Sequence, residues 1–350
     1  MRHTLFLVTG ALGHLGNTLV RLLVRQGCRV RGLVLPNDRS TALEGVDFER
    51  IPGDIRDPVS LRHFFDLESA GVDPDRTAVL HTAGIVSIAS KYEQRVFDVN
   101  VEGTRNIVDA CLNAGIRRLV YTSSVHAIPE LDKGETIVEI DGGEEGAFSG
   151  KDVNGLYAKT KAMATRVVLD AIPRGLDAVI VHPSGILGPG DYGRAHLTQL
   201  VLDYMQGRLT AYVRGGYDLV DVRDVAAGMV AAAENGRTGE SYILSNRYIE
   251  VGDLMKMLRR ISGHKRTLTL LPFAFAKLTA PLAELWYKLM RQPPLFTRYS
   301  LYTLESNSIF SHDKATAELG YHPRPIEETI EDMIAWLRSQ GRIQLAHGTA

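Results

Sequence analysis

The stretch Thr9-Gly10-Ala11-Leu12-Gly13-His14-Leu15-Gly16 joins an apolar run, Thr4–Thr9, to a segment with leucines and valines at helical spacing, Leu15–Arg25. The run predicts a strand and the spacing predicts a helix. In this position the first glycine permits a tight turn, the second lets a ligand approach the backbone, and the third lets the helix pack closely on the strand. The start of a helix also offers unpaired N–H groups and the positive end of its dipole, which favour anions. A phosphate site is therefore predicted from Gly10, Gly13, His14, Leu15 and Gly16, with a purely structural glycine turn as the alternative.

Outward from this turn, short β-branched runs alternate with longer helical patterns over the first half of the chain. The runs predict further strands at Arg29–Leu35, Val46–Ile51, Ala78–Thr82, Arg118–Thr122 and Ala178–His182. The longer patterns predict helices at Ser60–Asp66, Val96–Ala114 and Tyr157–Ala171. Strands separated by helices pair in parallel through right-handed crossovers. The chain is therefore expected to form an α/β fold with a doubly wound parallel sheet of the Rossmann type.

After Pro183, strand and helix patterns no longer alternate regularly. The remaining patterns predict short strands at Leu209–Val213 and Ser241–Leu244, and helices at Val225–Ala233, Val251–Ile261 and Ile326–Arg338. We expect a dinucleotide-binding domain over residues 1–183. A smaller, C-terminal substrate-binding region, over residues 184–345, is expected to be interleaved with the sheet.

Two segments differ from their surroundings. Leu131–Gly150 is rich in glycine and glutamate without an apolar period, which predicts an exposed flap that orders when substrate binds. Leu268–Met290 is apolar, but Lys277, Pro281 and Glu284 interrupt it, so a membrane-spanning helix is not expected. Packing against the rest of the protein is favoured over an amphipathic lid or a contact with a membrane surface.

The composition narrows the function classes. A net charge of -1 over 350 residues removes the basic surface that nucleic acid would require. Cys28 and Cys111 are too few for a disulfide framework and lack the spacing of a metal site, which favours a reducing compartment and no metal. Met1–Val8 runs directly into the glycine turn without a cleavage site. We therefore expect a cytoplasmic protein.

The loop after the second expected strand, Val34–Arg39, bears on the choice of dinucleotide. An acidic residue at the strand tip accepts from the ribose 2′-hydroxyl of NAD(H), whereas an arginine pairs with the 2′-phosphate of NADP(H). Neither Val34 nor Leu35 is acidic, and Arg39 follows closely. This pattern favours NADP(H), and NAD(H) stays possible if Asp38 turns inward.

A second polar group follows the third expected strand, in the stretch Gly53–Asp57. Asp54 is suited to accept from an adenine amino group, with the Ile55 backbone against the ring. A turn at Asp54 with a helix cap at Asp57 is the structural alternative.

Candidate catalytic residues lie on one expected helix and at the end of the fifth expected strand. Tyr157 and Lys161 are four residues apart, so both project from the same helix face. A tyrosine has a pKa of about 10, and an ammonium nearby lowers it toward the range useful for proton transfer to a carbonyl. Ser123-Ser124 ends a strand at the sheet edge where open parallel sheets bind ligands, so a hydroxyl of either serine could hold the substrate oxygen.

These motifs together resemble the extended short-chain dehydrogenase/reductase superfamily, and most closely its dihydroflavonol reductase and hydroxysteroid dehydrogenase-like branch. The resemblance covers nearly the whole chain. The stretches that carry it are Thr9–Gly16, Asp54-Ile55, His81–Gly84, Asp98–Asn100, Thr122–Ser124, Tyr157–Lys161, His182–Gly190, Asp221–Ala226 and Asn307–Tyr321. The chain departs from the NADP(H)-dependent members at Leu35, where they tend to carry arginine.

The resemblance implies a role for each matching position. It implies Tyr157 as acid and base, Lys161 as its pKa modulator and a ribose contact, Ser124 as the substrate-orienting hydroxyl and Asn100 as support for the water network. It further implies that Ala83 contacts the adjacent ribose and that Pro183 and Ile186 lie near the nicotinamide. The family's dimers pair two long helices, here approximately Val96–Ala114 and Tyr157–Ala171, so a homodimer is possible.

Three functions compete at this point. The favoured one is an oxidoreductase that transfers a hydride between NAD(P)(H) and a carbonyl or secondary alcohol of a small, moderately hydrophobic substrate. The alternatives are a nucleotide-sugar epimerase or dehydratase and a non-catalytic dinucleotide sensor. Arg194, Arg214 and Arg223 are scattered rather than clustered for a sugar-nucleotide diphosphate, and the intact serine, tyrosine and lysine disfavour a sensor.

Overall fold

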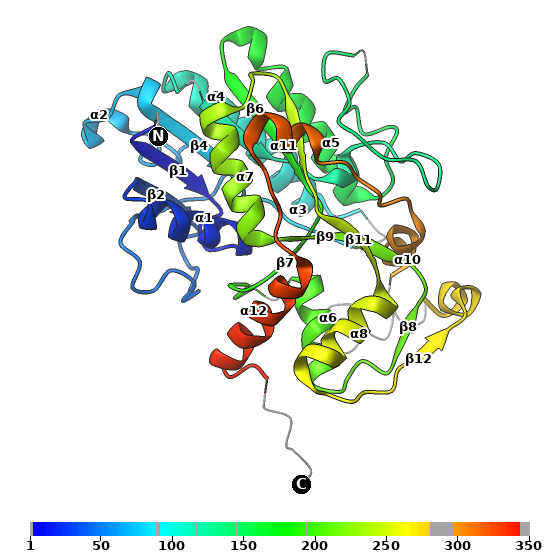
Figure 1. The fold of residues 1–350 in the computed structure, drawn as a ribbon. Coiled ribbons are helices and arrows are strands. Elements are labelled where there is room, and N and C mark those ends of the chain that lie inside the picture. The colour runs from blue at the N-terminus through cyan, green and yellow to red at the C-terminus, as the bar shows by residue number, and fades with distance from the viewer. Residues whose placement is uncertain are drawn as a thin grey trace.

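A central sheet of seven parallel strands organises the molecule (Figure 1). The computed structural model describes residues 3–88, 92–116, 118–144, 146–193, 195–280 and 297–343. In order across the sheet, the strands are β10 (Ser241–Leu244), β6 (Asp177–Pro183), β5 (Arg118–Thr122), β4 (Thr77–His81), β1 (Leu5–Thr9), β2 (Arg29–Val34) and β3 (Glu49–Pro52). All of these strands pair in parallel. The doubly wound parallel fold predicted from the sequence is confirmed.

Helices bury both faces of this sheet, which explains why most of its strands are predominantly apolar. The edge strand β3 differs, because only Ile51 of its residues is buried. Alternate residues of β1 enter two different cores. Leu5 and Leu7 pack with α4 (Gly103–Asn113) and α5 (Leu156–Leu169). Phe6 and Val8 pack with α1 (His14–Arg25) and α7 (Val222–Asn235).

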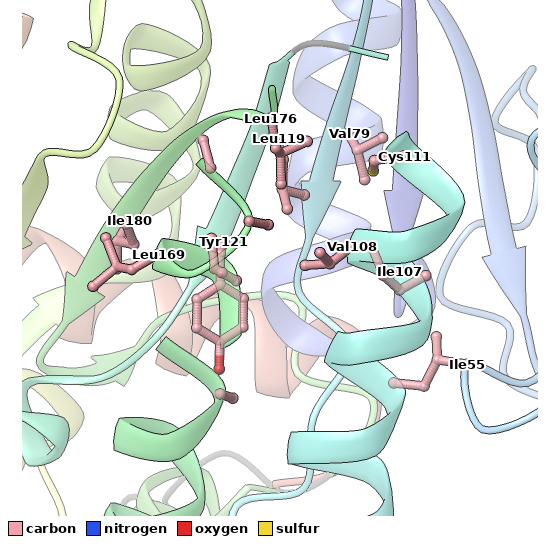
Figure 2. Close-up of a cluster of buried hydrophobic side chains, with 14 of the residues drawn as sticks. Ile55, Val79, Ile107, Val108, Cys111, Leu119, Tyr121, Leu169, Leu176 and Ile180 are labelled. Carbon is pink, nitrogen blue, oxygen red and sulfur yellow. The ribbon is translucent and has the colours of Figure 1, made fainter. Parts of the chain in front are cut away.

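The first of these cores lies between α4 and the sheet. Figure 2 shows Ile107, Val108 and Cys111 projecting from α4 toward Val79 of β4 and Leu119 of β5. Cys111 is completely buried here, in keeping with a small apolar side chain rather than a reactive thiol.

The chain reverses direction across the sheet beside β1. After β1 it forms β2 and β3 on one side, and then returns to form β4 on the other side of β1. A crevice therefore opens beyond the carboxyl ends of β1 and β4, at Thr9 and His81. Open α/β sheets bind ligands at such a switch point.

The later half of the chain builds a smaller region at one end of the sheet (Figure 1). It contains a sheet of β11 (Arg247–Glu250), β9 (Gly216–Asp221) and β7 (Gly185–Leu187), and a pair of strands, β12 (Thr269–Leu271) and β8 (Ala211–Val213). Its helices are α6 (His196–Met205), α8 (Val251–Ser262), α10 (Arg298–Glu305) and α12 (Ile326–Ser339). A third apolar core joins these elements. Because β10, α7 and α11 (Asp313–Leu319) pack with the large sheet, the later half is interleaved with the first.

Two predicted elements near β3 are wrong in their bounds. The expected helix at Ser60–Asp66 is a series of turns, and the short helix α2 (Leu67–Ala70) begins only after it, capped by the Asp66 side chain. The Ser60 hydroxyl bonds to the backbone of Asp54 and Asp57, a local bond that competes with helix formation. The strand expected from Val46 begins at Glu49.

The expected helix at Val96–Ala114 forms with a local irregularity. α3 (Gln94–Phe97) continues into a π-helical turn, Asp98–Glu102, and then into α4. π-Turns are often found at functional sites, and this one contains Asn100.

The segment Leu131–Gly150 is anchored along its length rather than freely exposed. The Ile137 N–H donates to Ile309 O at 2.8 Å, and the side chain of Ile137 is buried. Glu139 accepts from the Ile243 N–H of β10, and Arg166 of α5 donates to Gly142 O. Phe148, at φ 58, is buried and stacks on the His182 ring. These anchors are hydrogen bonds to residues distant in the sequence and two isolated buried side chains, Ile137 and Phe148, which is why the sequence pattern did not reveal them.

The segment Leu268–Met290 is described only in its first part. β12 pairs with β8, and residues 273–280 are helical. Residues 281–290 lie outside the described residues. In the part of the chain that the structure describes, no helix is both long enough and apolar enough to span a bilayer.

Candidate active site

The glycine turn after β1 is closely packed against the neighbouring strand. A Cβ on Gly10, whose φ is +66°, would lie 2.9 Å from the backbone of Ala83. A Cβ on Gly16 would lie 2.0 Å from Gly10 O, so only glycine allows α1 to start this close to the turn. The Gly13 N–H donates to Gly10 O at 2.9 Å and closes the loop. The turn thus leaves space for a ligand where side chains would otherwise fill it.

The start of α1 is open to an anion. The first helical bond runs from Asn17 N to Gly13 O, so the N–H groups of His14, Leu15 and Gly16 precede the helical ladder. Within the described chain, no side chain caps this end and no acidic residue lies in the first turn. These features fit the pyrophosphate of a dinucleotide.

Two adjoining cavities extend from this turn. One, of about 530 Å³, runs from Gly10 and His14 past Ser124 and Lys161 to Pro183 and Ile186. The other, of about 220 Å³, runs from the turn to Leu35, Asp38, Asp54, Ile55 and Ala83. Gly10, Gly13, Thr82 and Gly84 line both cavities. Their combined path, with the pyrophosphate turn in the middle, fits a dinucleotide that has its adenosine in the second cavity.

The loop sequence left the choice between NAD(H) and NADP(H) to Asp38 and Arg39, and the two residues lie differently relative to the adenosine cavity. Asp38 lines its wall, and one of its carboxylate oxygens accepts from the Ser40 N–H at 2.8 Å. Arg39 is exposed and is absent from the wall. Asp54 also lines the cavity, with its carboxylate held by Arg56 at 2.6 Å, which keeps the pKa of Asp54 below its usual value.

Tyr157 lies on the first turn of α5, at the opening between the larger dinucleotide cavity and a third cavity. It is 9% exposed, and burial raises its pKa to about 12, while a hydrogen bond with the Ser124 side chain acts in the opposite direction. The phenol is therefore protonated at neutral pH, as a proton donor must be.

The two serines that follow β5 have different surroundings. The Ser123 hydroxyl pairs with Thr165 Oγ1 at 2.7 Å, inside the core beside α5. Ser124 lines the dinucleotide cavity and faces Tyr157. Its carbonyl also accepts from His182 Nδ1, at 3.0 Å. Burial lowers the pKa of His182 to about 4, so this imidazole is neutral and its Nδ1 carries the proton.

Lys161 lies in the wall of the same cavity but is only 5% exposed. Its Nζ donates to Thr122 O at 2.6 Å and lies 5.0 Å from the centre of the Tyr121 ring. Burial lowers its pKa to about 7, so it is only partly charged at neutral pH. The Lys161 ammonium therefore contacts the Thr122 carbonyl and the Tyr121 ring, whereas the sequence predicted that it lowers the pKa of Tyr157.

Asn100 lies behind the site rather than in a cavity wall. Its Oδ1 accepts from Ile85 N at 2.8 Å, and its Nδ2 donates to Ile85 O and to Thr160 Oγ1, both at 3.0 Å. These bonds fasten the loop after β4 to helix α5. A Cβ on Gly84 would lie 3.3 Å from both Asn100 Oδ1 and Lys161 Nζ, which shows how closely the three residues converge.

The third cavity, of about 200 Å³, is lined mainly by apolar and aromatic side chains. Many come from α6, β8, β9 and α10 of the smaller region, including Leu197, Leu200, Val213 and Leu304. Leu209, between α6 and β8, and Val86 and Ile88, in the loop after β4, complete the apolar wall. Among its described lining residues there is no arginine or lysine. Arg214 lies elsewhere, in another pocket, and Arg223 pairs with Asp221 and Asp332, whereas Arg194 lies outside the described residues.

Two histidines at the site were missed by the sequence reasoning. His126 and His196 line both the dinucleotide cavity and the apolar cavity. His126 could have been found from the sequence, because it lies two residues beyond Ser124 where the chain leaves β5. His196, at the first position of α6, carries no such signal. No group of three or more histidine, cysteine or acidic residues that could hold a metal is found among the described residues.

Comparisons with known proteins identify the family and similar folds. The model of the NAD dependent epimerase/dehydratase family matches residues 6–245. The chain is 34% identical to sterol demethylase protein B of Methylococcus capsulatus, over 96% of this chain and 99% of that protein. It is 30% identical to 4-hydroxy-2-methyl-3-oxo-4-farnesyl-3,4-dihydroquinoline-1-oxide ketoreductase of Stigmatella aurantiaca, over 97% of this chain and 98% of that protein. The crystal structure of gox2253 superposes with a TM-score of 0.81 at 35% identity, covering 98% of this chain and all of the other.

Proposed function

The chain belongs to the NAD dependent epimerase/dehydratase family of extended short-chain dehydrogenases/reductases, and from this premise we propose a specific reaction. The protein transfers a hydride between a nicotinamide dinucleotide and the carbonyl or secondary alcohol of a small, moderately hydrophobic substrate. The observation that carries this proposal is the apolar cavity that opens directly onto Tyr157 and the dinucleotide cavity. Such a cavity favours an apolar molecule, and Tyr157 and Ser124 supply polar groups for its reacting oxygen.

In this proposal Tyr157 and Ser124 act on the same substrate oxygen. When a carbonyl is reduced, the Tyr157 hydroxyl donates its proton to that oxygen, and the Ser124 hydroxyl donates a hydrogen bond that orients it. A bound dinucleotide supplies the hydride in this direction and accepts it in the other. Lys161, which lines the same cavity, is available to contact a ribose of the dinucleotide.

The wall of the adenosine cavity supports NAD(H) rather than NADP(H). Asp38 lies where it can accept from a ribose 2′-hydroxyl and would repel a 2′-phosphate. Arg39, on which the preference for NADP(H) from the loop sequence rested, is exposed outside that wall. We therefore propose NAD(H) as the preferred cofactor.

An epimerase or dehydratase of a nucleotide sugar is the second candidate, because the family's name covers such enzymes. The lining of the apolar cavity disfavours it, since its described residues offer no arginine or lysine for a diphosphate. A non-catalytic sensor is disfavoured by the convergence of Ser124, Tyr157 and Lys161 on one cavity.

Redox stoichiometry decides between these functions. The protein is incubated with apolar ketones and NADH or NADPH, and the absorbance of reduced dinucleotide is compared with the amount of alcohol formed. The proposal requires one dinucleotide to be oxidised for each alcohol. Redox-neutral conversion of a nucleotide sugar, without net dinucleotide consumption, would instead establish the second candidate.

A further inference from the structure

A basic pocket of about 400 Å³ lies outside the dinucleotide and apolar cavities. None of its described lining residues lines either dinucleotide cavity, and Leu304 is the one that it shares with the apolar cavity. Its volume falls within the range of small-molecule sites. The segments that form it are distant in the sequence: the turn 133–134, the turn 214–215 between β8 and β9, Tyr248 of β11, Phe273 and the chain 304–309 at the end of α10.

Two cationic side chains of the basic pocket have no partner among the described residues. Lys133 and Arg214 form no hydrogen bond, ion pair or ring contact there. Other arginines of the smaller region do pair: Arg208, Arg223 and Arg247 each contact a carboxylate. The positive charge of Lys133 and Arg214 is therefore available to a group from outside the chain.

The carboxylate in the lining does not neutralise these cations. Glu305 is the single acidic side chain among the described lining residues, and it pairs with Lys277 at 2.8 Å. The same Lys277 ammonium lies 4.8 Å from the centre of the Phe273 ring. Glu305 and Lys277 cancel each other, so Lys133 and Arg214 leave the pocket with an excess of positive charge. Such an excess favours an anionic ligand.

The wall of the basic pocket also offers a hydroxyl that the protein does not use. Ser308 is 6% exposed, and its hydroxyl has no hydrogen-bond partner among the described residues. The hydroxyl of the nearby Ser306, by contrast, donates to Thr303 O at 2.9 Å. A side chain as enclosed as Ser308 usually uses its hydroxyl within the protein. A ligand oxygen in the pocket would supply the missing acceptor.

The remaining side chains of the basic pocket are apolar or aromatic. Tyr248 and Ile309 are each 39% exposed, and the Phe273 ring and Leu304 lie in the same lining. Aromatic faces and aliphatic side chains that remain partly open to water gain stability when they pack against an apolar body. The ligand that fits therefore has an apolar part beside its anionic group.

The turns that carry the two cations are fixed to the same segment of chain. Asn307 Nδ2 donates to Asp132 O at 2.9 Å and to Glu135 O at 2.7 Å, on either side of Lys133. Gly215, at φ +118°, packs so closely on the end of α10 that a Cβ would collide with Leu304 O. Because these anchors hold both turns before any ligand arrives, little ordering of the backbone opposes binding.

We propose that the basic pocket binds a small aromatic carboxylate. Arg214 and Lys133 hold its carboxylate group, and the Ser308 hydroxyl donates a hydrogen bond to it. Its ring packs against Tyr248 and Phe273. Because the pocket shares little with the apolar cavity, this ligand binds in addition to the substrate rather than in its place. The proposal does not depend on the hydride transfer proposed above.

A series of three probes tests the chemistry of the basic pocket. Isothermal titration of the full-length protein compares 2-naphthoate with 2-naphthylmethanol, which keeps the ring without the charge, and with acetate, which keeps the charge without the ring. We expect 2-naphthoate to bind at least about threefold more tightly than either of the other two. Raising the salt concentration should weaken the binding of 2-naphthoate more than that of 2-naphthylmethanol. An affinity for 2-naphthoate no higher than for 2-naphthylmethanol or acetate, or no binding of 2-naphthoate, overturns the proposal.

Variants assign the binding to named side chains. Arg214→Gln is expected to weaken the binding of 2-naphthoate by about 3- to 10-fold, and Ser308→Ala by about 2- to 12-fold. Arg62→Gln is the matched control, because Arg62 is also exposed and unpaired among the described residues but lines none of these cavities. It removes the same charge and is expected to leave the affinity unchanged. Equal effects of Arg214→Gln and Arg62→Gln would show that only the net charge matters and would overturn the site.

Backbone amide signals locate the bound probe. When 2-naphthoate is added, the NMR signals of Gly134, Gly215 and Ile309 are expected to shift, because these residues line the basic pocket. Those of Leu200 and His196, which line the apolar cavity, are expected to stay in place. Shifts at Leu200 and His196 without any at the three residues of the basic pocket would place the probe in the apolar cavity and overturn the proposal.

Discussion

At the scale of the single residue, the site contains a lysine held at an unusual pKa. Lys161 is almost fully buried, and its partners are a carbonyl and an aromatic ring rather than a carboxylate. Burial therefore dominates and lowers the pKa to about 7. In the unfolded chain the same lysine keeps its ordinary pKa of about 10.4. Between these two values the unfolded state binds more protons, so the free energy of unfolding contributed by Lys161 rises with pH.

The stability of Lys161→Met should show this dependence. Below pH 7, the buried lysine lowers the free energy of unfolding of the wild type by its full amount. This destabilisation disappears as the pH approaches 10. Relative to the wild type, the variant should lose roughly 3 kcal/mol of unfolding free energy between pH 7 and pH 10. Urea unfolding of both proteins at several pH values measures the difference. A difference that does not change with pH would mean that the pKa of Lys161 is not lowered in the folded protein.

A second prediction at this scale concerns Asp38 and Arg39. If Asp38 accepts from the ribose and repels a 2′-phosphate, NADH should bind at least about tenfold more tightly than NADPH. Asp38→Asn should remove most of this difference, and Arg39→Gln should leave it nearly unchanged. Fluorescence titrations with both dinucleotides measure the dissociation constants. Tighter binding of NADPH that is lost in Arg39→Gln would restore the preference inferred from the loop sequence.

At the scale of the element, the start of α5 determines where Tyr157 lies. Gly155 precedes the helix with φ +90°, and its Cα packs against the Tyr299 ring of α10. A Cβ at this position would lie 2.1 Å from that ring. The helix that carries Tyr157 and Lys161 is thus fixed against a wall of the apolar cavity.

Gly155→Ala should therefore lower the free energy of unfolding by more than the replacement of a glycine with positive φ ordinarily does. The backbone strain is about 1–2 kcal/mol, and displacing the Tyr299 ring adds about 1–3 kcal/mol. Gly27→Ala is the matched control, because Gly27 has φ +76° but no atom lies within 4 Å of the position that its Cβ would take. Urea unfolding should show the larger loss of stability for Gly155→Ala. Equal losses would indicate that the contact with Tyr299 is not rigid.

The segment Leu131–Gly150 gives a second prediction for an element. The bonds from Ile137 N to Ile309 O and from Ser311 N to Ile137 O should protect these two amides from hydrogen exchange before substrate is added. The exposed Gly134 should exchange much faster. Exchange measured by NMR without substrate tests this anchoring. Rapid exchange at Ile137, slowed by a substrate and dinucleotide, would instead support a flap that orders on binding.

At the scale of the whole molecule, the sequence predicted the large sheet better than the smaller region. Most strands of the large sheet are short apolar runs, so periodicity alone located them. β3, which is mostly exposed and follows β2 without an intervening helix, was predicted with the wrong start. The glycine turn and the pair Tyr157 and Lys161 were found because their spacing is local. The apolar cavity is lined by α6, β8, β9 and α10 together with the loop after β4, which lie far apart in the sequence, and no local pattern records their convergence.

The same limit applies to roles that depend on the surroundings of a side chain. That Ser124 rather than Ser123 faces Tyr157 depends on Thr165, 42 positions beyond Ser123. The possible homodimer stays a prediction. Among the described residues, the large apolar side chains exposed to solvent do not lie on α4 or α5, the helices expected to pair.

In the proposed reaction, Tyr157 transfers a proton while a hydride moves to or from the substrate carbon. Tyr157→Phe tests it most directly, because the ring and its buried packing remain while the hydroxyl is lost. Steady-state rates with a reactive ketone and titrations with the preferred dinucleotide are measured on the variant and the wild type. We expect kcat to fall by about 10²- to 10⁴-fold while the dissociation constant of the dinucleotide changes by less than about twofold. A variant that turns over at nearly the wild-type rate would contradict the assignment of Tyr157 as the proton donor.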